Sequence, residues 1–224
     1  MSELLYIGEE VLPALFRGLW ISLILILPSS VLGLAAGVLV GTLRVYGPTG
    51  FRWLTSAYVL VFRGFPLIVQ LYIWYFGLPR IDIYMSPYGA SVMGFVLCSA
   101  AYHSEYVRGA LLSIRHGQVL AAQSIGLDRL QTILYVIMPQ AFRRALPGCG
   151  NEIIYLIKYS SLAYMVTCIE LTGEGKILAS ASFKYIEVFV IVGVIYLGMV
   201  SIASWLLSML ENQLAIPGFE RYRS

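Results

Sequence analysis

Charged residues are scarce in this sequence. Lys, Arg, Asp and Glu make up 12% of the 224 residues, whereas 59% of the residues are hydrophobic. Soluble domains average about 25% charged and about 45–50% apolar residues. A soluble globular fold is therefore excluded, and the apolar excess predicts a single domain of membrane-spanning helices over residues 1–224. The net charge of +3 is too small and too dispersed to indicate a nucleic-acid partner.

Histidine and cysteine are also few, and they do not cluster. His103 and His116 are too widely separated for a recognisable metal site. Cys98, Cys149 and Cys168 lie in apolar surroundings without metal-ligand spacing, and they form no disulfide framework. We therefore expect three small buried thiols and no metal.

The common catalytic motifs are missing as well. The sequence contains no GxSxG, HExxH or CxxC pattern and no paired carboxylates. A short P-loop look-alike, GEGK at 173–176, is followed by Ile177 where the motif needs Ser or Thr. The sequence thus predicts that this chain is not an enzyme and holds no cofactor of its own.

Five apolar stretches predict five membrane spans. The first is uncharged over 18–43, which at about 1.5 Å per residue exceeds a hydrocarbon core of about 30 Å. It follows acidic residues and is too long for a signal peptide, so we expect the mature protein to keep it. The predicted spans cover about residues 14–44, 53–78, 83–112, 148–169 and 186–211.

Two of these spans contain unusual residues. Arg63, Gly64 and Pro66 interrupt the second, which predicts a broken or kinked helix. The fourth contains Glu152 and Lys158, which indicates that it faces protein or water rather than lipid.

Basic residues are distributed unevenly between the two sides. With the N-terminus outside and the C-terminus cytoplasmic, eight basic residues fall inside and four outside, as the positive-inside rule favours. The inner set is Arg44, Arg52, Arg115, Arg129, Arg143, Arg144, Arg221 and Arg223, and the outer set is Arg17, Arg80, Lys176 and Lys184. The longest connection, about 115–146, is then cytoplasmic, and its composition predicts short helices over 118–125 and 130–137, separated by Gly126.

Glycine recurs in the first span at every fourth position. Gly33, Gly37 and Gly41 line one helical face with small residues, so another helix can approach closely. We interpret this stripe as a packing surface.

Several ordered motifs resemble one transporter family. In the inner loop, Ala121 and Ala122, then Gly126, then VIMP at 136–139 have the spacing of the EAA signature of ABC-importer permeases. Elsewhere the chain is similar to the polar amino-acid uptake subfamily, through RGFPL at 63–67 with Gln70, SEYVRGA at 104–110, GQ at 117–118 and KYSSL at 158–162. The resemblance covers roughly residues 10–215.

The resemblance implies a function and a set of partners. It implies a permease subunit in the bacterial inner membrane that moves polar amino acids by alternating access. Energy would come from a dimer of separate ATPase subunits, which carry ATP and Mg. A second permease subunit, identical or similar, would complete the pathway. A periplasmic or lipid-anchored binding protein would deliver substrate near residues 170–184, and we expect Glu170 at the outer mouth.

The inner loop is then expected to contain a coupling helix between the third and fourth spans. Small residues let such a helix enter a groove of the ATPase, and glycine with a positive φ can end it. The candidate coupling residues are Gly117, Gln118, Ala121, Ala122, Gly126 and Pro139, the last of which we expect to break the following helix.

Two positions depart from the family pattern. Leu120 stands where the signature has Glu, and Phe65 stands where Thr is usual. Either this subunit docks chiefly by apolar contact, or it pairs with another permease that keeps the acidic residue.

Charged and polar residues at membrane depth are the candidates for the substrate pathway. A guanidinium such as Arg63 matches an amino-acid carboxylate, and a carboxylate such as Glu152 matches the ammonium. Glu152, Tyr155 and Tyr159 share one helical face. The remaining candidates are Ser160, Ser161 and Glu105.

Each candidate also has a structural interpretation. Arg63 is equally consistent with a fixed ion pair that stabilises the helix break. Glu105 is spaced to pair with Arg108 on its own helix, and serine hydroxyls readily bond to their own helix. The alternative function is an ion-coupled carrier or a channel-forming oligomer, in which Arg63, Glu105 and Glu152 relay ions or protons. A third possible function is a purely structural membrane partner that recruits the ATPase for another purpose.

Overall fold

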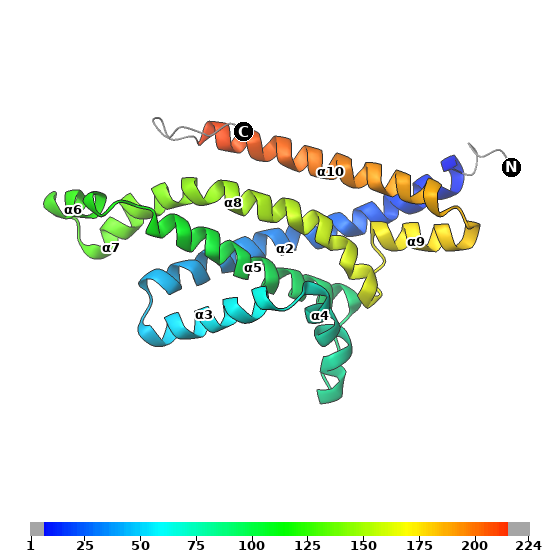
Figure 1. Cartoon of the computed structure of the whole chain (residues 1–224), viewed down its shortest axis with the longest axis horizontal. Helices are drawn as coiled ribbons and strands as arrows, with labels where there is room; N and C mark the ends of the chain where they lie inside the picture. Colours follow the sequence, from blue (N-terminus) through cyan, green and yellow to red (C-terminus); the bar gives the residue numbers. More distant parts are fainter. Residues whose placement is uncertain (1–6, 215–224) are drawn as a thin grey trace.

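The computed structural model describes residues 7–214 as an all-helical bundle, and no strand occurs in this part of the chain. The long helices lie side by side, as Figure 1 shows, and α6 and α7 project beyond one end of the bundle. Arg221 and Arg223 lie outside the described residues. The α-helices are α2 (Leu12–Tyr46), α3 (Thr49–Gly64), α4 (Leu67–Tyr72), α5 (Pro87–Leu112), α6 (His116–Ser124), α7 (Arg129–Gln131), α8 (Met138–Tyr159), α9 (Leu171–Ser182) and α10 (Tyr185–Gln213).

Short segments of wider or tighter helix connect several of these elements. The π-helical segments are η1 (Ile7–Val11), η2 (Ile73–Gly77) and η4 (Thr132–Ile137), and the 3-10 segments are η3 (Leu78–Ile81) and η5 (Ser160–Val166).

Length and composition identify two clear candidate spans among the described residues. They are Gly8–Tyr46 and Tyr185–Gln213. Two further helix pairs qualify as spans if each bent pair counts as one, Thr49–Gly64 with Leu67–Ile81 and Arg129–Val166 with Leu171–Ser182. These four candidates do not include α5, although its 26 residues extend about 39 Å at 1.5 Å per residue.

The second apolar stretch contains a sharp break, where the sequence predicts one. The helix α3 ends at Gly64, and α4 begins at Leu67 after a bend of 102°. Phe65 has an extended backbone because the following Pro66 disfavours the helical conformation at the preceding residue. Gln70 Nε2 then donates to the carbonyl oxygens of Phe62 and Phe65, each at 2.9 Å, so freed backbone acceptors are satisfied.

The glycine stripe of α2 packs closely against α5. A Cβ atom added at Gly37 would lie 2.3 Å from the His103 Cβ atom. Added at Gly33 or Gly41, it would lie 3.1 Å from Ser99 Cβ or 2.8 Å from the Ser104 carbonyl oxygen. Two helix backbones can approach this closely only where side chains are missing. The stripe is a packing surface, as the sequence indicates.

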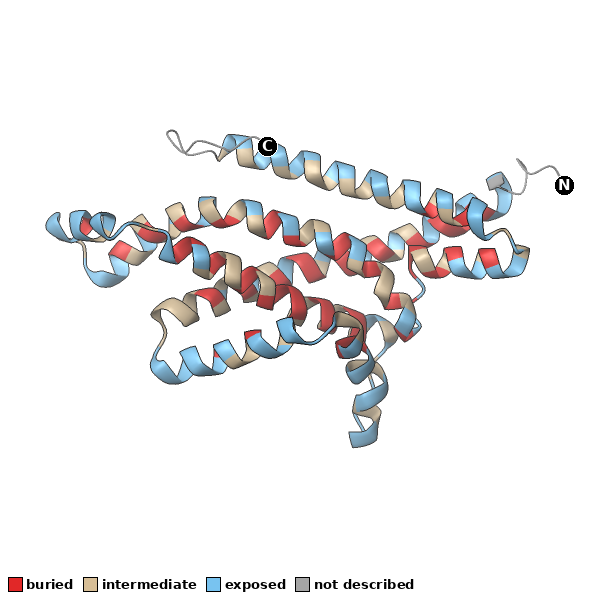
Figure 2. Cartoon of the chain, in the orientation of Figure 1, coloured by how far each residue is buried: buried red, intermediate tan, exposed pale blue. Residues whose placement is uncertain are grey.

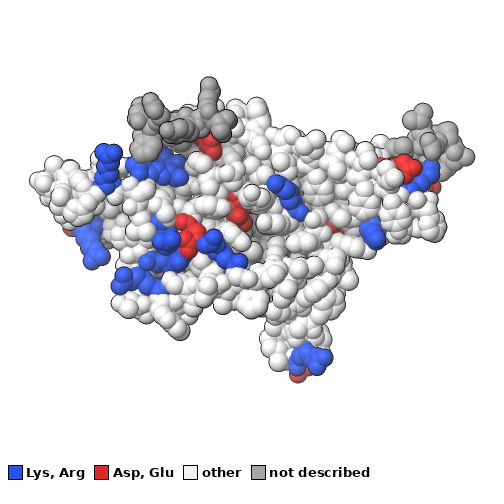
Figure 3. All heavy atoms as spheres, viewed as in Figure 1, with Lys and Arg blue, Asp and Glu red and all other residues white. Residues whose placement is uncertain are grey.

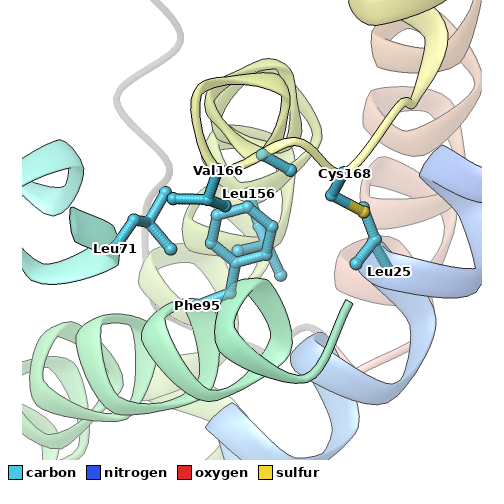
Figure 4. Close-up of a cluster of buried hydrophobic side chains, with 7 residues drawn as sticks. Leu25, Leu71, Phe95, Leu156, Val166 and Cys168 are labelled. Carbon is cyan, nitrogen blue, oxygen red and sulfur yellow. The ribbon is translucent and has the colours of Figure 1, made fainter. Parts of the chain in front are cut away.

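An apolar cluster joins five elements of the bundle. Phe95 of α5 lies among Leu25 of α2, Leu71 of α4, Leu156 of α8 and Val166 of η5, as Figure 4 shows. Lipid is as apolar as these side chains, so their close packing, rather than escape from water, holds the elements together. Buried residues concentrate along the middle of the bundle, whereas α10 is mostly exposed (Figure 2).

The fourth apolar stretch begins earlier than the sequence analysis places it. The helix α8 starts at Met138, so Pro147 lies inside the helix rather than before it. Pro139 occupies the first turn of α8, where a proline is tolerated because its missing N–H would have no helical partner. It therefore starts this helix instead of breaking it.

The long connection between α5 and α8, which the sequence analysis expects on the inner side, contains two short helices separated by a turn. Gly126 has a φ of +89° between α6 and α7, a conformation that glycine adopts without strain. Asp128 then caps α7, because its side chain accepts a hydrogen bond from the Gln131 N–H while the Gln131 side chain accepts one from the Asp128 N–H.

Candidate functional site

A buried carboxylate of α8 and a guanidinium of α3 lie on either side of α5, near enough to influence each other electrostatically. The Glu152 side chain of α8 is only 3% exposed. Arg63, in the last turn of α3, lies close enough to interact electrostatically with Glu152, and Ser99 of α5 also lies beside this carboxylate. Glu152 has no ion pair within 4.0 Å among the described residues. A buried carboxylate in this position can accept an external cation.

Aromatic rings surround these two charges. The Arg63 guanidinium lies 5.0 Å from the ring centroid of Tyr102. The rings of Tyr155 and Tyr159 are stacked at 6.1 Å, and the Lys158 ammonium lies 4.8 Å from the Tyr155 ring. Tyr159 lies near enough to Glu152 to feel its charge, and Tyr155 stacks on Tyr159. Lys158 lies nearer to these rings than helix periodicity indicates, since its long side chain reaches back along α8.

Glu105 lies in a separate cluster beside this site. Its carboxylate accepts hydrogen bonds from Arg44 and from Arg108, the latter at 2.7 Å. Arg63 lies 3.6 Å from the same carboxylate. The pairing with Arg108 matches the sequence spacing, but Arg44 and Arg63 extend the ion pair into a network that joins α2, α3 and α5. Three cations around one anion leave an excess of positive charge on this face, where Figure 3 shows basic side chains gathered.

Arg63 thus lies between two carboxylates. Its side chain is 41% exposed, against 13% for Arg44. The more exposed guanidinium retains room for another anion, so Arg63 has both a structural contact and an available face.

The two candidate serines donate to their own chain. Ser160 Oγ donates to the Ile157 carbonyl oxygen and Ser161 Oγ to the Lys158 carbonyl oxygen, each at 2.7 Å. Their hydroxyl protons are therefore engaged. Ser160 is also fully buried, so of the two only the Ser161 oxygen is accessible to another group.

Glu170 does not lie at an outer mouth, as the sequence analysis expects. The side chain is fully buried and caps α9, accepting from the N–H groups of Thr172 and Gly173 at 2.9 and 3.0 Å. It also accepts hydrogen bonds from the hydroxyls of Tyr196, at 2.9 Å, and Ser22, at 3.4 Å. Glu170 is buried because the positive N-terminal end of α9 stabilises an acidic residue at the N-cap, and because hydroxyls from α2 and α10 donate the remaining hydrogen bonds to its carboxylate.

The inner loop presents large apolar side chains. Leu120 of α6 is 52% exposed, whereas Ala122 is buried. Ala121, Gly117 and Gln118 are exposed, and a Cβ atom added at Gly117 or Gly126 would meet nothing within 4 Å. The other exposed apolar residues of this projection are Ile125, Leu130, Leu134 and Tyr135. These four residues and α6 are called the inner patch below. Large exposed apolar groups between polar residues are typical of a surface that binds another protein.

Sequence comparison identifies relatives of this chain. Residues 31–216 match the family described as the binding-protein-dependent transport system inner membrane component. The chain is 38% identical to the glutamine transport system permease protein GlnP of Escherichia coli over 215 residues, which cover 92% of this chain and 94% of the relative. It is 37% identical to the octopine transport system permease protein OccM of Rhizobium radiobacter over 191 residues, 78% of each chain.

Solved structures have the same fold. A chain of an amino acid ABC transporter crystallised with histidines superposes with a TM-score of 0.84 at 31% identity, covering 90% of this chain and 94% of the other. A chain of the methionine ABC transporter MetNI in an inward-facing conformation has a TM-score of 0.79 at 21% identity and covers 96% of this chain and 100% of the other. The second likeness concerns the fold alone.

Proposed function

The chain belongs to the family of binding-protein-dependent transport system inner membrane components, among the permeases of amino-acid ABC importers, and from this membership we propose a specific function. It is the permease subunit of an ATP-driven importer that moves polar amino acids across the bacterial inner membrane by alternating access. A separate pair of ATPase subunits binds ATP and Mg and supplies the energy. A periplasmic or lipid-anchored binding protein delivers the substrate.

The observation that carries the substrate class is the meeting of Glu152 and Arg63. A zwitterionic amino acid needs an anion for its ammonium and a cation for its carboxylate, and Glu152 and Arg63 supply these two charges from helices that both pack against α5. Tyr155 and Tyr159 contribute ring faces and hydroxyls on the same side of α8. Ser161 lies at the next turn, where its lone pairs can accept from the substrate, whereas the neighbouring candidate Ser160 is fully buried and would need a rearrangement to reach it.

The proposed topology has five spans with the N-terminus outside. Supporting it, the start of α2 and the end of α10 lie at opposite ends of the bundle, which an odd number of crossings requires (Figure 1). The loop after α2 and the projection of α6 and α7 lie at the end where α10 finishes, and these carry Arg52, Arg115 and Arg129. In this topology α3 and α4 form one broken span and α5 forms the third.

The inner patch is the proposed contact with the ATPase. In this role α6 is the coupling helix, with Gly117, Gln118 and Ala121 exposed toward the partner and Ala122 packed inward. The half-exposed Leu120 supports docking by apolar contact, the first of the two alternatives that the missing Glu leaves. The turn at Gly126, then α7 and η4, connect this helix to α8, which begins at Met138 with Pro139 in its first turn. In this proposal α8 carries the partner's movement to Glu152.

The proposed assembly contains two permease subunits. Large apolar side chains of α3 and of the segment after the break are exposed in the single chain, including Leu60, Phe65 and Phe76. Such surfaces must meet lipid or a second permease, either a copy of this chain or a similar one.

Reconstitution tests the proposal directly. The chain is co-expressed with its neighbouring ATPase and binding protein, inserted in liposomes, and assayed for uptake against a panel of amino acids. ATP-dependent uptake of one polar amino acid, lost when the ATPase carries an inactivating substitution, is the expected result. Uptake that follows an ion gradient and ignores ATP would instead establish the carrier.

A further inference from the structure

An apolar cavity lies between four helices, away from the charged site. It has a volume of about 280 Å³ and is lined by α2, α5, α8 and α10. Leu34 and Val107 contribute from α2 and α5, Ala145 and Ile153 from α8, and Leu207 and Leu210 from α10. All of its lining residues are apolar, so water would find no hydrogen-bond partners inside it.

The loose packing of α10 creates this cavity. Only Val188 and Val192 of α10 are buried, and both lie near its start. Farther along, Leu207 approaches α8 where Gly150 has no side chain: an added Cβ atom there would lie 2.1 Å from Leu207 Cδ1. Leu207 and Leu210 of α10 line the cavity together with Gly150 of α8. Figure 2 shows that this part of α10 is exposed or half-buried.

A basic residue follows the cavity on α8. Phe142 and Ala145 line the cavity, and between them Arg143 is exposed to the surroundings. The neighbouring Arg144 is held by Ser113, whose carbonyl oxygen accepts from it at 2.8 Å. In the proposed topology this turn of α8 lies at the inner surface of the membrane, where lipid phosphates are found. Basic groups beside gaps between helices on that side are typical sites for anionic headgroups.

We propose that this cavity binds one acyl chain of an anionic phospholipid of the inner leaflet, with Arg143 contacting the phosphate. A membrane provides only one abundant apolar molecule of this shape, and its headgroup charge complements Arg143. The lipid fills space that protein atoms leave open and thereby holds the inner half of α10 against α8. The inference uses the proposed orientation only to place the headgroup, and it does not depend on the transported substrate.

Two cavity-filling substitutions test the site. The full-length protein is purified in mild detergent and mixed with phosphatidylglycerol, and bound lipid is counted by native mass spectrometry. We expect one tightly held lipid on the wild type, and at least a fivefold loss of occupancy in Ala145→Leu and in Ile153→Phe. Ile202→Phe is the matched control, because Ile202 is 62% exposed on α10 outside the cavity, and it should retain the lipid.

The headgroup contact has its own test. Arg143→Gln should lower phosphatidylglycerol occupancy severalfold. Arg52→Gln is the control, because Arg52 is also an exposed arginine on the proposed inner side but is not a neighbour of the cavity-lining residues in the sequence, and it should not lower the occupancy. Phosphatidylcholine should bind more weakly than phosphatidylglycerol to the wild type.

Three results would overturn the inference. If Ala145→Leu and Ile153→Phe retained as much lipid as Ile202→Phe, the cavity would not be the lipid site. Equal binding of phosphatidylglycerol and phosphatidylcholine would show that the site does not select an anionic headgroup. A change in the permease dimer fraction, in place of lipid loss, would assign the cavity to a second copy of the chain. ATP-dependent uptake, measured in parallel, reports separately on the proposed transport function.

Discussion

Arg63 lies 3.6 Å from the Glu105 carboxylate while its guanidinium also acts on Glu152 of a different helix. The first contact fixes the end of α3, and the second places a cation beside a buried carboxylate. A single arginine therefore links the ion-pair network of the bundle to the candidate substrate site. Loss of Glu105 would leave Arg63 free to approach Glu152, so the network keeps the two opposite charges of the site apart.

Glu152→Gln should impair transport without unfolding the protein. The amide has nearly the same volume but no charge, so the substrate ammonium loses its anion. Since a hydrogen bond to a charged group contributes about 1.5–3 kcal/mol, uptake at low substrate concentration should fall about tenfold or more. The matched control is Glu187→Gln, which changes an exposed carboxylate at the start of α10. Unchanged uptake in Glu152→Gln would argue against this site.

Arg44→Gln should destabilise the bundle more than it affects the substrate. The Arg44 side chain is 13% exposed and joins α2 to Glu105 of α5, so its loss leaves a partly buried carboxylate with weaker partners. We expect a loss of about 1–3 kcal/mol and a lower melting temperature in detergent. Arg52→Gln, which loses only an exposed bond to Thr49, should melt as the wild type does. Equal melting of both variants would contradict the role of the network.

Gly37→Ala should disrupt the contact between α2 and α5. The new methyl group would lie 2.3 Å from the His103 Cβ atom, which belongs to a helix backbone position and cannot move alone. Overpacking of this kind costs about 1–3 kcal/mol. Gly198→Ala on α10 makes the same change where nothing lies within 4 Å, and its melting temperature should not fall.

Gly126→Ala should weaken association with the ATPase. Alanine at a φ of +89° is strained by about 1–2 kcal/mol, so the turn shifts and displaces α6 relative to α7. Co-purification of the ATPase, measured by size-exclusion chromatography, should decrease. Gly50→Ala, at the start of α3 with open space around it, should leave co-purification unchanged. A normal yield of complex from the Gly126 variant would exclude the turn from docking.

Local features of the fold could be predicted from the sequence. The break before Leu67 follows from Pro66, which restricts the residue before it, and the turn at Gly126 follows from the freedom of glycine at positive φ. The stripe in α2 follows from a four-residue spacing. Each depends on residues within one turn of each other, which is the range over which sequence patterns are informative.

Partnerships between distant residues could not be predicted in this way. Arg44 and Glu105 are 61 positions apart, and Ser22 and Glu170 are 148 positions apart. The local sequence around Arg44 does not show whether this residue joins an ion-pair network or lies exposed in the inner loop. The sequence around Glu170 likewise predicts an exposed acid, because its burial as the cap of α9 depends on helices that are distant in the sequence. Pro147 favours a helix boundary, and the predicted fourth span begins directly after it, whereas α8 begins at Met138 and contains this proline.

The hydrogen-bond donors around Glu170 constrain the order in which the helices assemble. Its carboxylate needs a hydroxyl from Ser22 of α2 and one from Tyr196 of α10, which is synthesised long after α2. While the nascent chain has yet to deliver Tyr196, this acid lacks one of its four donors and must stay hydrated. The bundle therefore cannot close span by span during insertion. Its assembly around Glu170 waits for α10, and chains truncated before α10 should be recognised as unfinished by membrane proteases.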